Sequence, residues 1–132
     1  MKKDKAPKLG QVQLKIMQVL WNRPDATARE ITDALNHGAK SSEQLAHSTV
    51  QTLLRQLEAK GVVAHSVEGR VFRFRATTEE RDVAVGATRD LLSRVFNSSV
   101  SGLVAHLLQH EKISDDEMAQ LKQLLRDAEK KS

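Results

Sequence analysis

An abrupt change of periodicity at Gly61 constrains the fold of this chain more than any other feature. Before it, an apolar stripe recurs at the spacing of one helix face, made of Val50, Leu53, Leu54 and Leu57. After it come two short runs rich in β-branched and aromatic residues, VVAHSV and RVFRFRA, with Glu68-Gly69 between them as a turn. The sequence therefore predicts a helix that ends at a C′ glycine and passes directly into a β-hairpin.

Two further helices are predicted upstream. The first carries an apolar face and ends near Trp21, which we expect to be a packing residue; that face is Val12, Ile16, Val19 and Leu20. The second begins at a capping box, Thr27 with Glu30, and its predicted core face is Ile31, Ala34 and Leu35. Residues 39–44 have no periodicity and are predicted to be a loop.

Three short helices followed by a hairpin is the element order of a winged helix-turn-helix domain, which we assign to residues 9–76. An α-helix fits the DNA major groove, and an adjacent β-ribbon reaches flanking phosphates or the minor groove. Opposite the apolar stripe, the third helix carries Ser48, Thr52 and Arg55, flanked by Gln51 and Gln56. Hydroxyl, amide and guanidinium groups can read base edges, so this face is predicted to bind DNA.

The distribution of charge agrees with this prediction. Residues 1–76 hold thirteen Lys or Arg against seven Asp or Glu, whereas residues 77–132 hold eight against ten. The basic half is where an anionic partner is expected. Residues 1–8 are predicted to be a disordered basic arm, either a solubilising tail or a segment that follows the DNA backbone.

Each candidate DNA contact also has a plainer interpretation. Ser48 or Thr49 would serve equally well as helix caps, and Arg55 as a solvated surface residue. Arg70, Arg73 and Arg75 fit phosphate contacts or the charges that protect exposed strand edges from aggregation. A winged domain that binds a protein instead of DNA is the alternative function, and operator preference distinguishes the two.

Residues 77–132 are predicted to be helical, with capping boxes at Thr77 with Glu80 and at Ser114 with Glu117. Helices of this size cannot enclose an ample core alone. We therefore expect a helical dimerisation domain, although folding back on the winged domain is the alternative. The expected dimerisation residues are Val83, Leu91, Val95, Leu103, Leu107, Met118, Leu121, Leu124 and Leu125. The expected fold class is thus mainly α with a small β-hairpin.

Several other classes of protein are not expected. The chain has no Cys, and it contains no Gly-rich phosphate loop, nucleophile elbow or HExxH run, so neither enzymatic activity nor a cofactor is predicted. His106 and His110 are spaced i, i+4 but lack further ligands, and we expect surface or interface histidines with no metal. The basic N-terminus is not followed by an apolar segment, so neither export nor a membrane span is expected.

From about Leu9 to Leu125, the order and spacing of four segments resemble the penicillinase repressor family, which includes BlaI, MecI and the copper-responsive CopY branch. The segments are LGQVQLKIMQVLW, ATAREITDALN, STVQTLLRQLEAKGVVAHSVEGRVFRFRA and SGLVAHLLQHEKISDDEMAQLKQLL. The resemblance implies a cytoplasmic bacterial repressor whose homodimer binds a palindromic operator, at its own promoter and at resistance or protease-regulator genes. It also implies intertwined C-terminal helices. It places the recognition helix at Ser48, Thr49, Gln51, Thr52 and Arg55, and the wing at Gly69, Arg70 and Arg73.

Two departures from the family concern the release of DNA. In β-lactam-responsive members, the resemblance implies cleavage at an Asn-Phe bond, which aligns here with His106-Leu107. The copper branch uses C-terminal cysteine pairs, and this chain has no Cys. Asp115-Asp116-Glu117 and the helix after it still match the family. The sequence therefore predicts the DNA-binding and dimer modules but leaves the release signal open.

Overall fold

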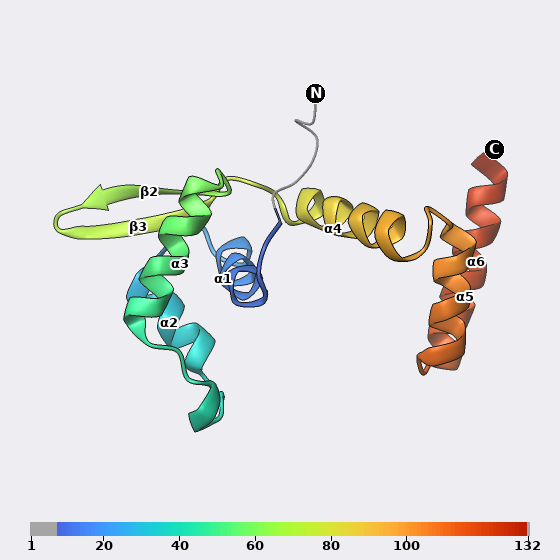
Figure 1. Ribbon diagram of the computed structural model, residues 1–132, viewed down its shortest axis with the longest axis horizontal. Helices are drawn as coiled ribbons and strands as arrows, with labels where there is room; N and C mark the ends of the chain where they lie inside the picture. The colour runs from blue at the N-terminus through green and yellow to red at the C-terminus, as the bar shows by residue number, and fades with distance from the viewer. Residues whose placement is uncertain (1–7, 132) are drawn as a thin grey trace. The chain divides into compact units, whose positions relative to one another are not determined.

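The computed structural model describes residues 8–131 and is mainly helical, with one small antiparallel sheet (Figure 1). The elements in chain order are α1 (Gln11–Trp21), β1 (Ala26–Thr27), α2 (Ala28–Asn36), the 3₁₀ turn η1 (Ser41–Glu43), α3 (His47–Ala59), β2 (Val63–Glu68), β3 (Val71–Ala76), α4 (Glu80–Val95), α5 (Val100–His110) and α6 (Asp115–Lys131). The chain divides into two compact units within α4, one ending at Thr88 and the other beginning at Arg89. Of the predicted basic arm, residues 1–7 lie outside the described part, and the Lys8 carbonyl accepts a hydrogen bond from Lys60 Nζ at 2.6 Å.

The first unit has its core where α1, α2 and α3 meet. The side chains at its centre are fully buried: Ile16, Met17, Ile31, Val50, Leu54 and Leu57. The predicted stripe of α3 is confirmed at Val50, Leu54 and Leu57, while Leu53 is half-buried. Trp21 packs against this core, and its indole Nε1 donates to the Thr78 carbonyl at 2.7 Å, so it is a packing residue as expected.

The buried faces of α1 and α2 differ from the predicted ones because a polar residue occupies a stripe position in each helix. In α1 the buried set is Gln13, Ile16, Met17 and Leu20, whereas Val12 and Val19 are half-buried. In α2, Thr32 is buried and Ala34 is exposed, so the prediction of Ala34 as a core residue was wrong. The Thr32 hydroxyl donates to the Ala28 carbonyl at 2.7 Å, which allows it to be buried without an unsatisfied polar group.

Gln13 shows how a polar side chain can hold helices together. Its Nε2 donates to Gln56 Oε1 at 2.9 Å, and its Oε1 accepts from the Gly10 backbone N–H and from Lys60 Nζ, both at 2.9 Å. The amide thus links the start of α1 to the end of α3. A hydropathy pattern does not reveal this position, because only the tertiary partners make its burial favourable.

The end of α3 has the geometry predicted for its glycine. Gly61 adopts φ +83°, its N–H donates to Glu58 O at 3.0 Å, and the Val62 N–H donates to Leu57 O at 3.2 Å. These two bonds make a Schellman motif, in which a residue without a Cβ takes the left-handed conformation. The motif turns the chain directly into β2, and Gly69, with φ +66°, turns it again into β3.

The sheet has three strands in the order β1-β3-β2, not the two that the sequence predicts. The additional strand, β1, is two residues long and pairs Ala26 with Phe74 and Thr27 with Arg73. Thr27 also begins α2, where the predicted capping box is confirmed: Glu30 N–H donates to Thr27 Oγ1 at 3.1 Å and Thr27 N–H to Glu30 Oε1 at 2.9 Å. A two-residue strand has no periodicity of its own, so its pairing was not predictable from pattern.

The second unit contains the end of α4 together with α5 and α6. Asn97 and Ser98, with φ of 52° and 63°, interrupt the helix, and Ser99 caps α5 through the Gly102 N–H at 2.9 Å. Ser114 Oγ accepts from the Glu117 N–H at 3.1 Å, which is one of the two hydrogen bonds of the predicted capping box. The predicted cap at Thr77 is wrong: α4 begins at Glu80, and the Thr77 hydroxyl instead donates to the Gly61 carbonyl at 2.9 Å.

No residue of α5 or α6 is buried, and the second unit presents a large apolar surface. Its exposed aliphatic side chains retain between 42% and 67% of their accessible area; they are Leu91, Val95, Val100, Val104, Leu107, Leu108, Leu124 and Leu125. None of the helices in the described part is long and apolar enough to cross a bilayer. The domain boundaries expected at residues 8 and 76, and the roles attached to them, stay predictions.

Replacing Leu54 with Ala should destabilise the first unit by about 2–5 kcal/mol, because the side chain is fully buried and the cavity left behind cannot collapse completely. The matched control is Leu14→Ala on the outer side of α1, where the side chain is 36% exposed. Its effect should stay within about 0.5 kcal/mol. Urea unfolding followed by Trp21 fluorescence measures both, and equal midpoints for the two variants would contradict the assigned core.

Candidate nucleic-acid interface

The polar face of α3 is exposed along its length. Burial of its apolar stripe leaves the residues on the other side in solvent, and they are Ser48, Thr49, Gln51, Thr52 and Arg55. Arg55 Nη2 donates to Thr52 Oγ1 at 3.2 Å, and the Thr52 hydroxyl donates to the Ser48 carbonyl at 3.1 Å. Ala46 is the N-cap of α3 and makes no side-chain cap, so Ser48 and Thr49 do not have the capping role that was their alternative.

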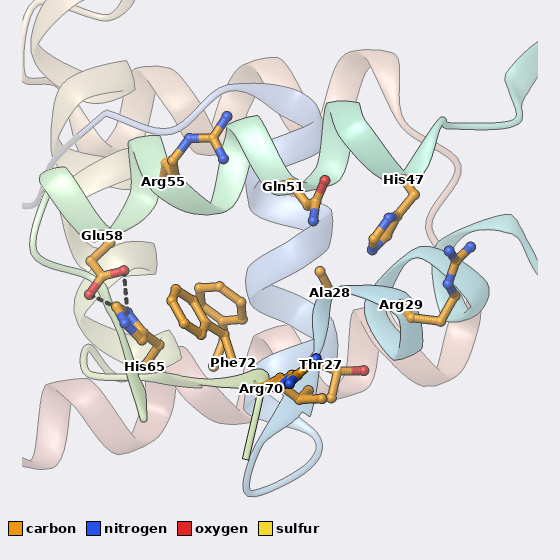
Figure 2. Close-up of a pocket in the computed structure, with 12 residues that line it drawn as sticks. Thr27, Ala28, Arg29, His47, Gln51, Arg55, Glu58, His65, Arg70 and Phe72 are labelled. Atoms are coloured by element: carbon orange, nitrogen blue, oxygen red, sulfur yellow. Dashed lines mark hydrogen bonds and ion pairs between the residues drawn. The ribbon is translucent and has the colours of Figure 1, made fainter. Parts of the chain in front are cut away.

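A cavity of about 830 Å³ lies between α3, the beginning of α2 and the β2–β3 hairpin (Figure 2). Its lining comes from all three elements and comprises Thr27, Ala28, Arg29, His47, Gln51, Arg55, Glu58, His65, Arg70, Val71, Phe72 and Phe74. Figure 2 shows His65 and Phe72 on one side of the hollow and His47 and Arg29 on the other. The cavity thus joins the predicted recognition helix to the predicted wing.

Three of the cavity's side chains are guanidinium groups from different elements. Arg29 lies in the first turn of α2, Arg55 on α3 and Arg70 at the hairpin turn, and all three are exposed. Among the described residues, none of these guanidinium groups has a carboxylate within 4.0 Å. Sequence reasoning missed Arg29, because its approach to α3 and the hairpin depends on how α2 packs against α3, and it also missed His47, the first residue of α3. A cationic surface without internal counter-ions favours an anionic partner.

Arg73 has carboxylate partners and Arg70 has none among the described residues, although both were predicted to contact DNA from the wing. Its Nη2 lies 2.8 Å from Asp25 Oδ1 and 3.5 Å from Glu30 Oε1, and its Nε donates to the same Asp25 oxygen at 2.9 Å. The hydrogen bond to Asp25 raises the pKa of Arg73, and the charges of Asp25 and Glu30 act in the same direction. This guanidinium therefore joins β3 to the start of α2.

A second set of contacts holds the hairpin to α3. His65 Nδ1 lies 2.8 Å from both carboxylate oxygens of Glu58, and the His65 ring stacks on Phe72 with centroids 4.2 Å apart and an interplanar angle of 11°. Phe74 completes the aromatic group at 5.7 Å from His65 and is buried. These contacts order the hairpin beside the polar face of α3.

The predicted dimerisation residues differ in exposure. Val83 is buried at 8% exposure and belongs to the first unit, whereas Leu91, Val95, Leu107, Leu124 and Leu125 are exposed. Leu103, Met118 and Leu121 are half-buried. The rings of His106 and His110 lie 4.5 Å apart, and the described part of the chain contains no cluster of three or more metal-ligating side chains.

The three-helix core, the Schellman turn and the hairpin beside an exposed polar helix define a winged helix-turn-helix protein. The chain belongs to the penicillinase repressor family, whose model matches residues 9–127. It is 28% identical to the penicillinase repressor of Bacillus licheniformis over 92% of this chain and 91% of that protein. It is 20% identical to the methicillin resistance regulatory protein MecI of Staphylococcus aureus over 92% of this chain and 96% of that protein. The solution structure of the DNA binding domain of the repressor BlaI is similar with a TM-score of 0.50 and 31% identity, covering 59% of this chain and 90% of that one.

Glu30 is expected to make the stability of the first unit depend on pH. The hydrogen bond from the Thr27 backbone N–H lowers its pKa below the ordinary value of 4.5, and the charges of Arg73 and Arg23 lower it further. A lowered carboxyl pKa contributes stability that is present above 4.5 and is lost as pH falls through the folded-state value. Glu30→Gln should therefore be less stable than the wild type at pH 7, and the difference should shrink below pH 4.5.

Thermal midpoints measured across this pH range test the assignment of Glu30. Glu43→Gln is the control, because Glu43 is exposed and has no ion pair among the described residues. A Glu30→Gln deficit that is the same at acidic and neutral pH would show that charge does not contribute.

Proposed function

We propose that this protein is a cytoplasmic transcriptional repressor that binds a palindromic operator as a homodimer, with one α3 in each of two major grooves. The observation that carries the proposal is the outward face of α3, which is polar, exposed and flanked by guanidinium groups without internal counter-ions. Membership of the penicillinase repressor family and the similarity to a penicillinase repressor and to the DNA binding domain of the repressor BlaI support the same function. By the resemblance, the regulated genes are those for resistance or for protease regulators. Steric exclusion of transcription is the proposed mechanism.

Within the interface, the α3 side chains read bases and the surrounding cations bind phosphates. We assign the reading of base edges to Gln51, Thr52 and Arg55. The DNA contacts next to these are assigned to Ser48 and Thr49 at the start of α3. Arg70 is assigned to the backbone, where Gly69 gives the wing its turn. Arg29 and His47 are added to the backbone contacts because they line the same hollow.

Arg73 is proposed to act indirectly. The sequence predicts a backbone contact for it, but its guanidinium is already paired with Asp25 and Glu30. Removing it from those carboxylates to bind phosphate would leave two carboxylates near the DNA. We therefore assign Arg73 to positioning the wing relative to α2.

The second unit is proposed to mediate dimerisation. No residue of α5 or α6 is buried. These helices would therefore gain stability if a second copy of the chain covered their aliphatic side chains. Two-fold symmetry in the protein then matches two-fold symmetry in the operator. The residues assigned to this contact are Leu91, Val95, Leu103, Leu107, Met118, Leu121, Leu124 and Leu125. Val83, predicted from the sequence to be a dimerisation residue, is buried in the first unit, so we assign it instead to supporting the start of α4.

Arg55→Ala and Arg70→Ala should weaken DNA binding in different ways. Loss of a base contact by Arg55 should relax preference at one operator position, at a cost of about 1–3 kcal/mol. Loss of a phosphate contact by Arg70 should weaken all duplexes equally and reduce the slope of affinity against salt. Arg94→Ala is the control, because Arg94 lies in the second unit, where it pairs with Asp90, and is not among the proposed DNA contacts. Competition binding with single-base operator variants measures these effects, and unchanged preference in Arg55→Ala would overturn the base-reading assignment.

Leu121→Glu with Leu124→Glu should give a monomer that loses most operator affinity, because two charges cannot be buried in an apolar contact without partners. Lys122→Glu on the same helix is the control and should remain dimeric, since Lys122 is exposed and lies outside the aliphatic set. Analytical ultracentrifugation reports the assembly state. An intact dimer in the double variant would contradict the proposed contact.

A further inference from the structure

We propose that the cavity between α3 and the hairpin binds a small planar aromatic anion, of the aryl carboxylate class, and that this ligand competes with DNA. The binding site is inferred from the cavity alone. The competition rests on the proposed function, because it assumes that α3 and Arg70 contact an operator.

The dimensions and floor of the cavity suit a small aromatic molecule. Its volume of about 830 Å³ falls in the range of small-molecule sites, about 300–1,000 Å³. The apolar part of its lining is Ala28, Val71, Phe72 and Phe74. Val71 and Phe72 each keep 47% of their area exposed, so a ligand that packs on them would remove apolar surface from water.

Phe72 offers a rigid aromatic surface. His65 stacks on the ring at 4.2 Å, and Glu58 fixes His65 through its carboxylate at 2.8 Å. A ligand ring that packs on Phe72 therefore pays little entropy to order its partner. Glu58 is the one carboxylate among the described lining residues, and both of its oxygens lie 2.8 Å from His65 Nδ1.

The cations of the cavity supply the selectivity for negative charge. Arg29, Arg55 and Arg70 contribute to the lining from α2, α3 and the hairpin turn, so the lining carries three guanidinium groups against a single carboxylate. Guanidinium groups bind carboxylates through paired hydrogen bonds and also stack on aromatic rings. The apolar part of the lining and its guanidinium groups together favour a ligand that is both planar and anionic.

Occupation of the cavity would engage side chains that the operator also needs. Gln51, Arg55 and Arg70 belong both to the lining and to the proposed DNA contacts. For two ligands that exclude each other, the apparent affinity for one falls by the factor 1 + [L]/Kd of the other, which is about 100-fold at 100 times Kd. Such competition would release DNA without cleavage at an Asn-Phe bond and without cysteine chemistry, and this chain contains neither an Asn-Phe dipeptide nor a Cys.

Isothermal titration calorimetry of the full chain with 2-naphthoate tests the site directly. We expect saturable binding of 2-naphthoate, binding at least tenfold weaker for cyclohexanecarboxylate, which lacks the aromatic ring, and at least tenfold weaker for 2-naphthalenemethanol, which lacks the charge. Equal binding of all three compounds, or no binding of 2-naphthoate, would overturn the proposal.

Two variants of the hairpin locate the site. Phe72→Ala should weaken 2-naphthoate binding at least tenfold, whereas Val67→Ala should change it less than twofold, because Val67 is 60% exposed on the same hairpin but does not line the cavity. Circular dichroism checks that both variants remain folded. If Phe72→Ala is not folded, amide chemical-shift changes in the wild type decide instead. Shifts at Gln51 and Phe72 support the site, and shifts confined to α5 and α6 contradict it.

Adding 2-naphthoate to an operator complex then tests the competition. Release of DNA at concentrations that fill the cavity supports it, and a complex that stays intact with the cavity filled overturns it. If the chain binds no operator at all, the proposed function fails, and the calorimetry still decides whether the cavity binds the anion.

Discussion

Burial of one face of α3 against α1 and α2 determines the rest of the first unit. Val50, Leu54 and Leu57 are fully buried, and a helix with one side fixed in the core must present its other side to solvent. That exposed side carries hydroxyls, amides and Arg55, the groups able to read base edges. The interface is thus a consequence of packing, because the apolar stripe sets the rotation of the helix about its axis.

The hairpin depends on the same helix for its place. The Schellman turn at Gly61 directs the chain out of α3 into β2, and the pair of Glu58 with His65 then ties the hairpin back to α3. On the other side, Arg73 joins β3 to Asp25, which precedes β1, and to Glu30 on α2. The wing is therefore held at two points, one on each helix of the helix-turn-helix, and the cavity lies between these attachments. A mobile hairpin could not keep Arg70 at a constant distance from α3.

The elements that sequence predicts correctly are those whose signals are local. A glycine after an apolar stripe, Thr27 three residues before Glu30, and an alternating pair of runs act through neighbours in the chain, so the end of α3, the cap of α2 and the hairpin were all predictable. The same spacing at Thr77 and Glu80 gave a wrong cap, because the Thr77 hydroxyl donates to the distant Gly61 carbonyl. Gln13 was missed because tertiary hydrogen bonds make its burial favourable, and Thr32 was missed because its hydroxyl is satisfied within α2 by the Ala28 carbonyl. Strand β1, the ion pairs of Arg73 and the approach of Arg29 to the cavity likewise depend on contacts between distant segments.

The central claim is that α3 and the wing bind DNA with a sequence preference. The most direct measurement is fluorescence anisotropy of the purified protein with DNA from its own promoter and with a scrambled duplex of equal composition, over a series of salt concentrations. The account predicts tight binding to the promoter, weaker binding to the scrambled duplex, and an affinity that falls steeply with salt because phosphate contacts release counter-ions. Equal and weak binding to both duplexes, with a protein partner bound through the same surface, would contradict it and favour a winged domain used for protein contact.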